Sequence, residues 1–228
     1  MGTVAQRSML IRLGLLGALA VVAVLAAVAI GGPGGGSATG GGGTPAPDSA
    51  LRGIPQSGVV LGSPDAPVTM VEFADLQCPF CAEYHHQVFP KLLNRYVRAG
   101  KLRLELRLLR FLGPDSDRLA RAAAAAAAQN RMWQFAGLAY DRQGTENSGY
   151  ASDSFIKGLL ADAGVRNAHL GAAAERQVRG AEQAARTLGI DATPSFLIGP
   201  TGGKLARFQP TELTPGAFIP RIQQELSR

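Results

Sequence analysis

The two cysteines of this 228-residue chain lie close together, in the segment Cys78-Pro79-Phe80-Cys81. A disulfide stabilises a fold mainly by closing a loop in the unfolded chain, and the effect grows with loop length. A bridge between Cys78 and Cys81 would close so short a loop that it adds little stability. The spacing instead suits reversible oxidation or the binding of a metal ion.

Chemistry at this pair depends on the elements around it. The mostly apolar run 68–73 predicts a buried strand, and a helical pattern begins at the cysteines and continues to about Arg98, before Gly100. Pro79 suits the first turn of that helix, where its missing N–H costs nothing. The motif is therefore expected between a strand and a helix.

A cysteine at a helix N-terminus faces unpaired backbone N–H groups and the positive end of the helix dipole, and both stabilise a thiolate. We therefore expect Cys78 to be exposed, to have a lowered pKa and to be the sulfur that attacks or is attacked. Cys81 lies one turn further along the helix, so we expect it to be more buried and to act as the resolving thiol.

The remaining pattern predicts an α/β domain. Leucines and charged residues alternate strictly over 101–108, which predicts a strand with one buried face. Helices are expected over 115–142, 152–163, 168–188 and 212–226, and further strands over 190–198 and 204–208. The order strand, helix, strand, helical block, hairpin and helix predicts a mixed sheet with helices on both faces and an inserted helical subdomain at about 113–188.

The N-terminal segment predicts export from the cytoplasm. Arg7 and Arg12 precede an uncharged apolar run of eighteen residues, 13–30, which is nearly long enough to cross a bilayer. We expect residues 1–30 to form a cytoplasmic tip and a single-pass transmembrane anchor. The alternative is a cleaved signal peptide, since Ala27-Val28-Ala29 offers small residues for cleavage. In either case the main domain would lie outside the cytoplasm, where disulfides persist.

The segment 31–50 is rich in glycine and proline and predicts a flexible linker, and 51–228 is long enough for one domain. The chain carries a formal net charge of +6, spread over expected helix surfaces rather than gathered in a basic stripe with aromatic residues. This distribution argues against nucleic-acid binding.

Two stretches resemble the DsbA-like branch of the thioredoxin fold: VEFADLQCPFC at 71–81 and LGIDATPSF at 188–196. The resemblance covers roughly residues 58–226 and includes the helical insertion. It implies a thiol–disulfide oxidoreductase whose redox centre is the cysteine pair, without a metal or other cofactor. The family has a histidine before the second cysteine, where this chain has Phe80. Because Phe80 cannot donate a hydrogen bond to Cys78, we expect a weaker oxidant than the family's best-known members.

The resemblance also implies roles for three other residues. Pro194 would be preceded by a cis peptide bond and lie against the cysteines, and the Thr193 backbone would pair with an extended substrate. Glu72 would be a buried acid with a raised pKa that exchanges protons with Cys81. The alternatives are a trans bond before an edge strand and a glutamate that faces solvent. Pro79 and Phe80, between the cysteines, are expected to contact substrate.

Other functions were compatible with the same residues. Cys78, Cys81 and His85 would share one helix face and provide part of a metal site, although His85 and His86 are more simply partly exposed helix residues. A reductase or isomerase of the same fold, and an interaction domain with a structural disulfide, remain further alternatives. Trp133 and Phe135 are expected in the helical core, and a substrate groove is the alternative place for them.

The favoured hypothesis is a membrane-tethered, extracytoplasmic oxidoreductase that donates the Cys78–Cys81 disulfide to exported proteins with free cysteines. As the resemblance implies, a membrane partner of the DsbB or vitamin K epoxide reductase type would re-oxidise it.

Overall fold

The computed structural model of the chain describes residues 47–228. The predicted transmembrane segment 13–30 and most of the predicted linker 31–50 lie outside these residues. Within 47–228 no helix has both the length and the apolar character needed to cross a bilayer.

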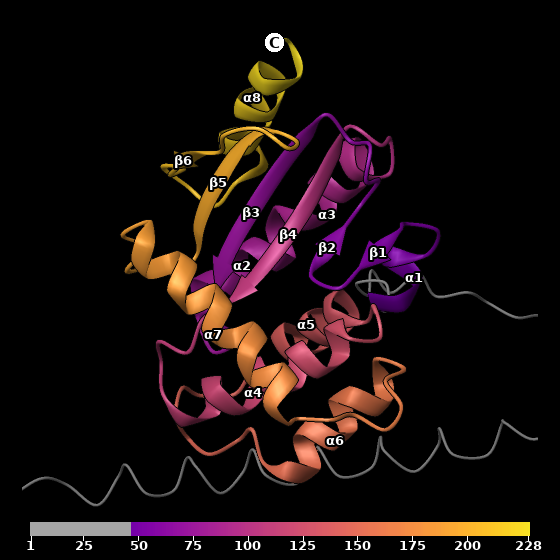
Figure 1. The fold of residues 1–228 in the computed structure, drawn as a ribbon, viewed down its shortest axis with the longest axis vertical. Coiled ribbons are helices and arrows are strands. Elements are labelled where there is room, and N and C mark those ends of the chain that lie inside the picture. The colour runs from indigo at the N-terminus through magenta and orange to yellow at the C-terminus, as the bar shows by residue number, and fades with distance from the viewer. Residues whose placement is uncertain (1–46) are drawn as a thin grey trace, which may run out of the picture. The chain divides into compact units, whose positions relative to one another are not determined.

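A six-stranded mixed sheet forms the centre of the domain (Figure 1). Its order is β1-β2-β4-β3-β5-β6, and β3 and β4 are parallel while the other neighbouring pairs are antiparallel. The strands are β1 Gln56–Ser57, β2 Val60–Leu61, β3 Val68–Ala74, β4 Leu102–Leu108, β5 Ser195–Pro200 and β6 Ala206–Phe208. The predicted strands are therefore present, with the boundaries shifted by a few residues.

The two central strands follow their sequence patterns. Every residue of β3 is buried, as expected of a strand covered on both faces, whereas β4 alternates between buried leucines and partly exposed charged residues. β3 pairs in register with both neighbours, so that Glu72 lies opposite Leu106 on β4 and opposite Phe196 on β5. Because β3 and β4 are parallel, both end at the same edge of the sheet.

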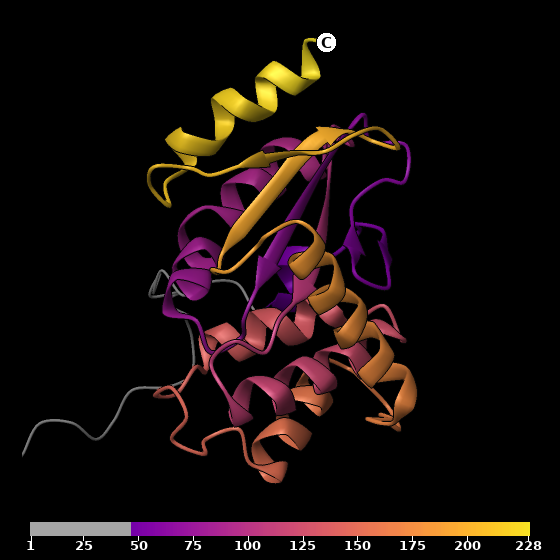
Figure 2. The same cartoon turned by 60° about the vertical axis from the view of Figure 1, so that its left-hand side comes forward.

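Helices cover both faces of the sheet, as predicted. Helix α7 (Ala172–Thr187) lies on one face, where its Ala185 packs with Val71 and Phe73. Helices α2 (Pro79–Gln87), α3 (Phe89–Leu92) and α8 (Pro215–Leu226) cover the other. Figure 2 shows α2 and α7 on opposite sides of the sheet. Tyr84 of α2, Phe196 of β5 and Phe218 of α8 contact one another through their rings, with centroids 4.9–5.4 Å apart.

The helix predicted from Cys78 to Arg98 is broken, so this prediction was wrong. Helix α2 ends at Gln87, the short α3 begins at Phe89, and residues Leu93–Val97 form a π-helical turn. Pro90 lies in the first turn of α3. Proline has no N–H to continue a helix and its ring clashes with the preceding turn, which explains the break.

The predicted helix 115–142 is likewise two helices, α4 (Pro114–Ala127) and α5 (Met132–Asp141). Asn130 lies between them with a φ of 58°, in the left-handed region that asparagine tolerates better than most residues. With α6 (Asp153–Asp162), these helices pack beside the sheet and form the inserted subdomain (Figure 1). Trp133 and Phe135 are 3% and 0% exposed, so the prediction that they lie in the core is confirmed.

Helix α1 (Pro47–Leu51) and the short strand pair β1–β2 are not predicted by the sequence pattern. Contacts with distant residues hold this segment. The Asn130 side chain accepts a hydrogen bond from the backbone of Gly58, and the Trp133 indole donates to the carbonyl of Val59. Strands this short carry too little periodicity to be predicted from their sequence.

Candidate active site

The cysteine motif lies where β3 ends and α2 begins, as predicted. Cys78 is the N-cap residue of α2, with extended backbone angles, and Pro79 follows in the first turn. The Cys78 N–H donates to the carbonyl of Asp75 at 3.0 Å, which closes a tight turn between strand and helix. Cys78 therefore faces the unpaired N–H groups of the helix start.

Cys78 is nearly buried, contrary to the expectation that it is exposed. It is 5% exposed, because the segment before β5 lies against it. The Cys78 thiol donates a hydrogen bond to the carbonyl oxygen of Thr193 at 3.3 Å, and the Thr193–Pro194 peptide bond is cis. Pro194 is itself buried. The structure thus brings together two segments that lie more than a hundred residues apart.

The two sulfurs have opposite electrostatic environments. The pKa of Cys78 is lowered to about 6, mainly by a hydrogen bond from the Cys81 thiol, against the opposing effect of burial. The Thr193 side chain and the backbone N–H groups of Cys81 and Phe80 lower it further. Cys81 is fully buried, and burial is the main cause that raises its pKa well above that of an ordinary thiol. Cys78 is therefore a thiolate near neutral pH while Cys81 stays protonated. The Phe80 side chain does not contribute to this difference between the pKa values of the two thiols.

Glu72 lies behind the cysteines in the middle of the sheet. It is 5% exposed, so the alternative that it faces solvent is excluded. Burial, and to a lesser extent the negative charge on Cys78, raises the pKa of Glu72 to about 8. The charge on Glu72 in turn contributes to the raised pKa of Cys81. The carboxyl group is therefore protonated near neutral pH and can exchange that proton close to the buried sulfur.

A groove of about 570 Å³ opens beside the motif. Phe80, Thr193, Pro194 and the loop 209–214 line it, together with Glu83. Phe80 is 60% exposed although it is aromatic, and Pro79 next to it is also exposed. An exposed aromatic ring beside a reactive sulfur is typical of a surface that contacts another molecule.

The histidines do not join the cysteines. The His85 ring is partly buried and stacks on Phe89 with centroids 4.9 Å apart, and the pKa of His85 is lowered to about 3, chiefly by burial. His86 is exposed and pairs with Asp141 at 3.0 Å. Among residues 47–228, no three His, Cys, Asp or Glu side chains gather in a way that suits a metal ion. The metal-site alternative therefore gains no support.

Asp75 was not singled out in the sequence, yet it organises the turn before Cys78. It is fully buried and accepts hydrogen bonds from the backbone N–H groups of Gln77, Phe111 and Leu112 and from the Ser116 hydroxyl, at 2.6–3.1 Å. These donors come from the turn itself and from the segment that enters α4. The feature of the sequence that could have pointed to Asp75 is its position as a charged residue directly after a buried strand.

Hydrogen bonds of two glutamine side chains also connect this turn to the helical subdomain. The Gln143 amide donates to the carbonyls of Leu76 and Cys78 at 3.0 and 3.2 Å. Gln77 donates to Ser116 and accepts from the backbone N–H of Asn147. The helical insertion thus holds the Cys78 backbone in place, which no local pattern in the sequence indicates.

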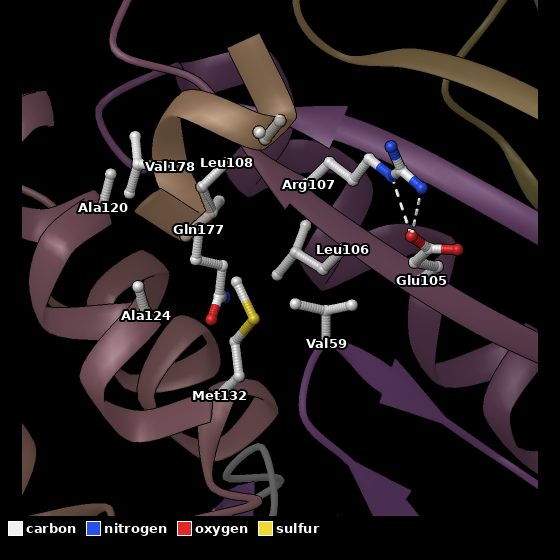
Figure 3. A pocket seen from close by; sticks show the side chains of 12 residues that line it. Val59, Glu105, Leu106, Arg107, Leu108, Ala120, Ala124, Met132, Gln177 and Val178 are labelled. Carbon is white, nitrogen blue, oxygen red and sulfur yellow. Dashed lines mark hydrogen bonds and ion pairs between the residues drawn. The ribbon is translucent and has the colours of Figure 1, made fainter. Parts of the chain in front are cut away.

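A second cavity, of about 280 Å³, lies away from the cysteines between β4 and helices α4, α5 and α7 (Figure 3). Leu106, Leu108, Met132 and Val178 line it together with small alanines, and Gln177 points toward the sulfur of Met132. At its edge, Glu105 and Arg107 form an ion pair at 2.7 Å. The cavity contains no group that suits thiol chemistry.

Comparison with known proteins agrees with this geometry. A family model described as thioredoxin matches residues 55–205. The chain belongs to the thioredoxin family. Disulfide bond formation protein D of Bacillus subtilis is 35% identical over 85 residues, which cover 37% of this chain and 34% of that protein. A probable disulfide bond formation protein D of Bacillus cereus is 32% identical over 102 residues, or 44% of this chain and 47% of that protein. The matches thus span about half or less of these relatives.

Solved structures share the fold of this thioredoxin-family chain. Oxidised BdbD from Bacillus subtilis has a TM-score of 0.63 at 21% identity and covers 77% of this chain and 98% of its own. The α-DsbA1 of Wolbachia pipientis has a TM-score of 0.62 at 21% identity, covering 77% and 92%. The resemblance to DsbA-like proteins is therefore confirmed for the fold and its helical insertion.

Proposed function

We propose that this chain is an extracytoplasmic thiol–disulfide oxidoreductase that donates the Cys78–Cys81 disulfide to exported proteins. One observation carries the proposal: the Cys78 sulfur, with its pKa lowered to about 6, lies at a helix start against the carbonyl of Thr193 in a cis Thr193–Pro194 segment. The names of the relatives, which refer to disulfide bond formation, support it.

The reaction is a two-step exchange in which both electrons come from the substrate. A substrate thiolate attacks the Cys78 sulfur of the oxidised enzyme, the Cys78–Cys81 bond breaks, and Cys81 leaves as a thiolate that takes up a proton. We assign the supply of this proton to Glu72, whose carboxyl group is protonated near neutral pH. A second substrate thiolate then attacks the substrate sulfur of the mixed disulfide. The substrate leaves with a disulfide, and Cys78 is released as a thiolate.

The acidity of Cys78 supports the oxidase direction. A thiol of lower pKa is a better leaving group, and stabilisation of the thiolate stabilises the reduced enzyme, which makes its disulfide more oxidising. The hydrogen bonds to Cys78 come from Cys81, Thr193 and the backbone, so the absence of a donor at Phe80 is partly compensated. The equilibrium reduction potential against glutathione separates an oxidase from a reductase or isomerase of the same fold.

The groove beside Cys78 supports an extended peptide as substrate. The backbone of Thr193 would pair with the peptide segment that carries the reacting cysteine, as a short added strand. Exposed Phe80 and the adjacent Pro79 offer an apolar surface to the neighbouring peptide side chains.

The proposal includes a membrane tether. Residues 13–30 would form a single-pass anchor in the cell membrane, and 31–50 a flexible linker that keeps the catalytic domain near the outer surface. A membrane partner of the DsbB or vitamin K epoxide reductase type would accept the two electrons. The charge pattern around 13–30 supports this arrangement. Fractionation of cells that express the full chain would test it, since a cleaved signal peptide would leave the domain outside the membrane fraction.

The activity is tested with reduced, unfolded ribonuclease. The oxidised protein should convert it to disulfide-bonded forms faster than buffer does, and Cys78→Ala should reduce the rate to that of buffer. Equal rates for the unmodified protein and Cys78→Ala would overturn the proposal.

A further inference from the structure

The groups that make Cys78 reactive all depend on where its backbone lies. The Cys78 thiolate is stabilised by the Cys81 thiol, the Thr193 side chain and N–H groups at the start of α2. Pro79 has no N–H, and the exposed ring of Phe80 has no polar hydrogen to donate. A small rotation of the Cys78 backbone would therefore weaken several of these hydrogen bonds at once. The contacts that fix the turn before α2 also fix the environment of the sulfur.

The chain changes conformation at the residue that carries this sulfur. Cys78 has extended backbone angles, with a ψ of 120°, and the helix begins at the next residue. Its N–H donates to the carbonyl of Asp75 at 3.0 Å, and its carbonyl accepts from the N–H of Ala82 at 3.1 Å. The Asp75 carboxylate anchors the beginning of the turn to the N–H groups of Phe111 and Leu112. The second half of the turn needs a support of its own.

Gln143, from the helical subdomain, holds this second half. Its side-chain amide donates to the carbonyls of Leu76 and Cys78 at 3.0 and 3.2 Å. One planar amide group thus bridges two carbonyls that are two residues apart, which restricts the rotation of the backbone between them. The partial positive charge of its N–H groups also lies next to the residue that carries the thiolate. Both effects favour the thiolate of Cys78 over the thiol.

The packing of α5 determines where this amide lies. The Trp133 ring stacks on that of Phe89 at 5.5 Å between centroids, and the Tyr140 ring lies 5.1 Å from that of His85. These contacts fix α5 against α2 and α3. The Gln143 N–H donates to the carbonyl of Tyr140 at 3.3 Å, which holds Gln143 at the end of α5. A packed helix therefore carries the amide to the turn.

The loop after Gln143 contacts the same turn a second time. The Asn147 N–H donates to the Gln77 side chain at 2.7 Å, and the Gln77 amide donates back to the Asn147 side chain at 3.2 Å. Gly144 lies so close to the Tyr150 ring that a Cβ in its place would come within 2.5 Å of the ring. The loop can follow this path because the position is glycine. The turn is thus held by the subdomain at two neighbouring residues.

We propose that Gln143 is a positioning residue that keeps the Cys78 sulfur directed at the start of α2, so that the helical subdomain sets how readily the Cys78–Cys81 disulfide accepts electrons. The inference rests on the proposed function, because it concerns the sulfur that exchanges with substrate. Gln143 acts through the backbone carbonyls of the turn and takes no part in the exchange of sulfur bonds. It acts where the two side chains between the cysteines supply no hydrogen bond to the thiolate.

Gln143→Met tests the inference, because methionine keeps the length of the side chain and removes the N–H donors. Gln143 is partly exposed, so the variant should fold. Ultraviolet absorbance of the reduced protein against pH gives the pKa of Cys78, since burial raises the pKa of Cys81 well above that range. The pKa of Cys78 should rise toward that of an ordinary thiol. The equilibrium with glutathione should shift toward the oxidised protein by about twofold to tenfold, the range for one hydrogen bond. Gln143→Ala removes the same donors and should shift both values in the same direction.

Gln129→Met is the matched control. Gln129 belongs to the same subdomain, and its side chain also forms two hydrogen bonds to backbone, with the carbonyl and the N–H of Arg166 at 2.6 and 3.0 Å. These bonds connect the turn after α4 with the segment after α6, and neither reaches the turn before α2. The control should lose stability in urea unfolding, as Gln143→Met should, and keep the pKa of Cys78 and the glutathione equilibrium of the unmodified protein. Neither substitution changes a charge.

The possible results separate the inference from the proposed function. A pKa of Cys78 and a glutathione equilibrium in Gln143→Met equal to those of the unmodified protein would overturn the inference and leave the proposed function intact. Equal changes in Gln143→Met and Gln129→Met would also overturn it, because they would reflect a general loosening of the subdomain. An unmodified protein that does not oxidise reduced ribonuclease would overturn the proposed function instead.

Discussion

The groove beside Cys78 and the cavity of Figure 3 differ in what their walls can do. The groove, of about 570 Å³, is lined by Thr193, whose carbonyl accepts from the Cys78 thiol of lowered pKa, and by the exposed ring of Phe80. The cavity, of about 280 Å³, is lined mostly by leucine, valine, methionine and alanine, and its one ion pair is already satisfied. Both are hollows at the boundary of the sheet. Only the groove lies where a helix N-terminus faces a cysteine.

This difference teaches that chemistry at a hollow comes from the groups that face it rather than from its size. The Cys81 thiol, the Thr193 side chain and the N–H groups at the start of α2 all stabilise the Cys78 thiolate. The cavity near α7 is bordered by the sides of helices, whose N–H groups are already bonded within the helix. We therefore expect changes in the groove to alter reactivity, and changes in the cavity to alter stability alone.

The largest expected effect separates the two cysteines. At about pH 7, a thiol with a pKa near 6 is mostly thiolate, whereas one with a pKa well above 9 is less than about 1% thiolate. In the reduced, unmodified protein, the initial alkylation of Cys78 should therefore be at least about 100-fold faster than that of Cys81. The alkylation of each cysteine is measured by mass spectrometry of peptides after timed exposure to iodoacetamide. Similar initial rates at the two cysteines would show that the assignment of attacking and resolving sulfur is wrong.

A change in the second cavity should affect stability and leave reactivity alone. Met132 is 2% exposed, and Met132→Ala should lower the free energy of unfolding by about 2–5 kcal/mol through lost burial and an enlarged cavity. Urea unfolding measures this. The alkylation rate of Cys78 in the folded variant should stay within about twofold of the unmodified protein, because no hydrogen bond to the thiolate is removed. A large loss of Cys78 reactivity in Met132→Ala would contradict the expectation that changes in the cavity affect stability alone.

Glu72→Gln should make the protein more stable near neutral pH. The pKa of Glu72 rises from 4.5 to about 8 on folding, so between these values the folded state binds more protons than the unfolded state. The stability of the unmodified protein therefore falls as pH rises through this window. At about pH 7 the variant should gain on the order of 1–3 kcal/mol in the free energy of unfolding, and the gain should vanish near pH 4. Urea unfolding at both pH values measures it.

Glu83→Gln offers a control for this pH dependence. Glu83 lies on α2 near the same site but is partly exposed. The variant should show no comparable gain at about pH 7. An equal gain in the two variants would contradict burial as the cause of the shift.

The smallest effect concerns the charge of substrates. Glu83 and Glu212 are among the residues that line the groove, no lysine or arginine does, and neither glutamate forms an ion pair within residues 47–228. A cysteine peptide with adjacent lysines should be oxidised up to about fivefold faster than one with adjacent glutamines, since exposed pairs contribute about 0.2–1 kcal/mol. The double change Glu83→Gln and Glu212→Gln, or high salt, should remove the preference. A preference that survives both would have another origin.

Much of the fold could be predicted from local patterns. The apolar run of β3 and the alternation of β4 each reflect which faces are buried, and both strands were found close to their expected bounds. The breaks at Pro90 and Asn130 were missed because the flanking residues continue a helical pattern on both sides. The resemblance, rather than spacing, pointed to Pro194 and to the burial of Glu72.

The sequence by itself determined the placement of the two sulfurs to which we assign the chemistry: Cys78 at the start of a helix and Cys81 one turn further, because that placement follows from a few consecutive residues. Only the tertiary structure decided how those atoms are held. The Gln143 amide donates to the Cys78 carbonyl across 65 positions of the chain, and the Cys78 thiol meets the Thr193 carbonyl across 115. Such contacts depend on how helices pack against a sheet, and packing depends on the whole core rather than on any short segment.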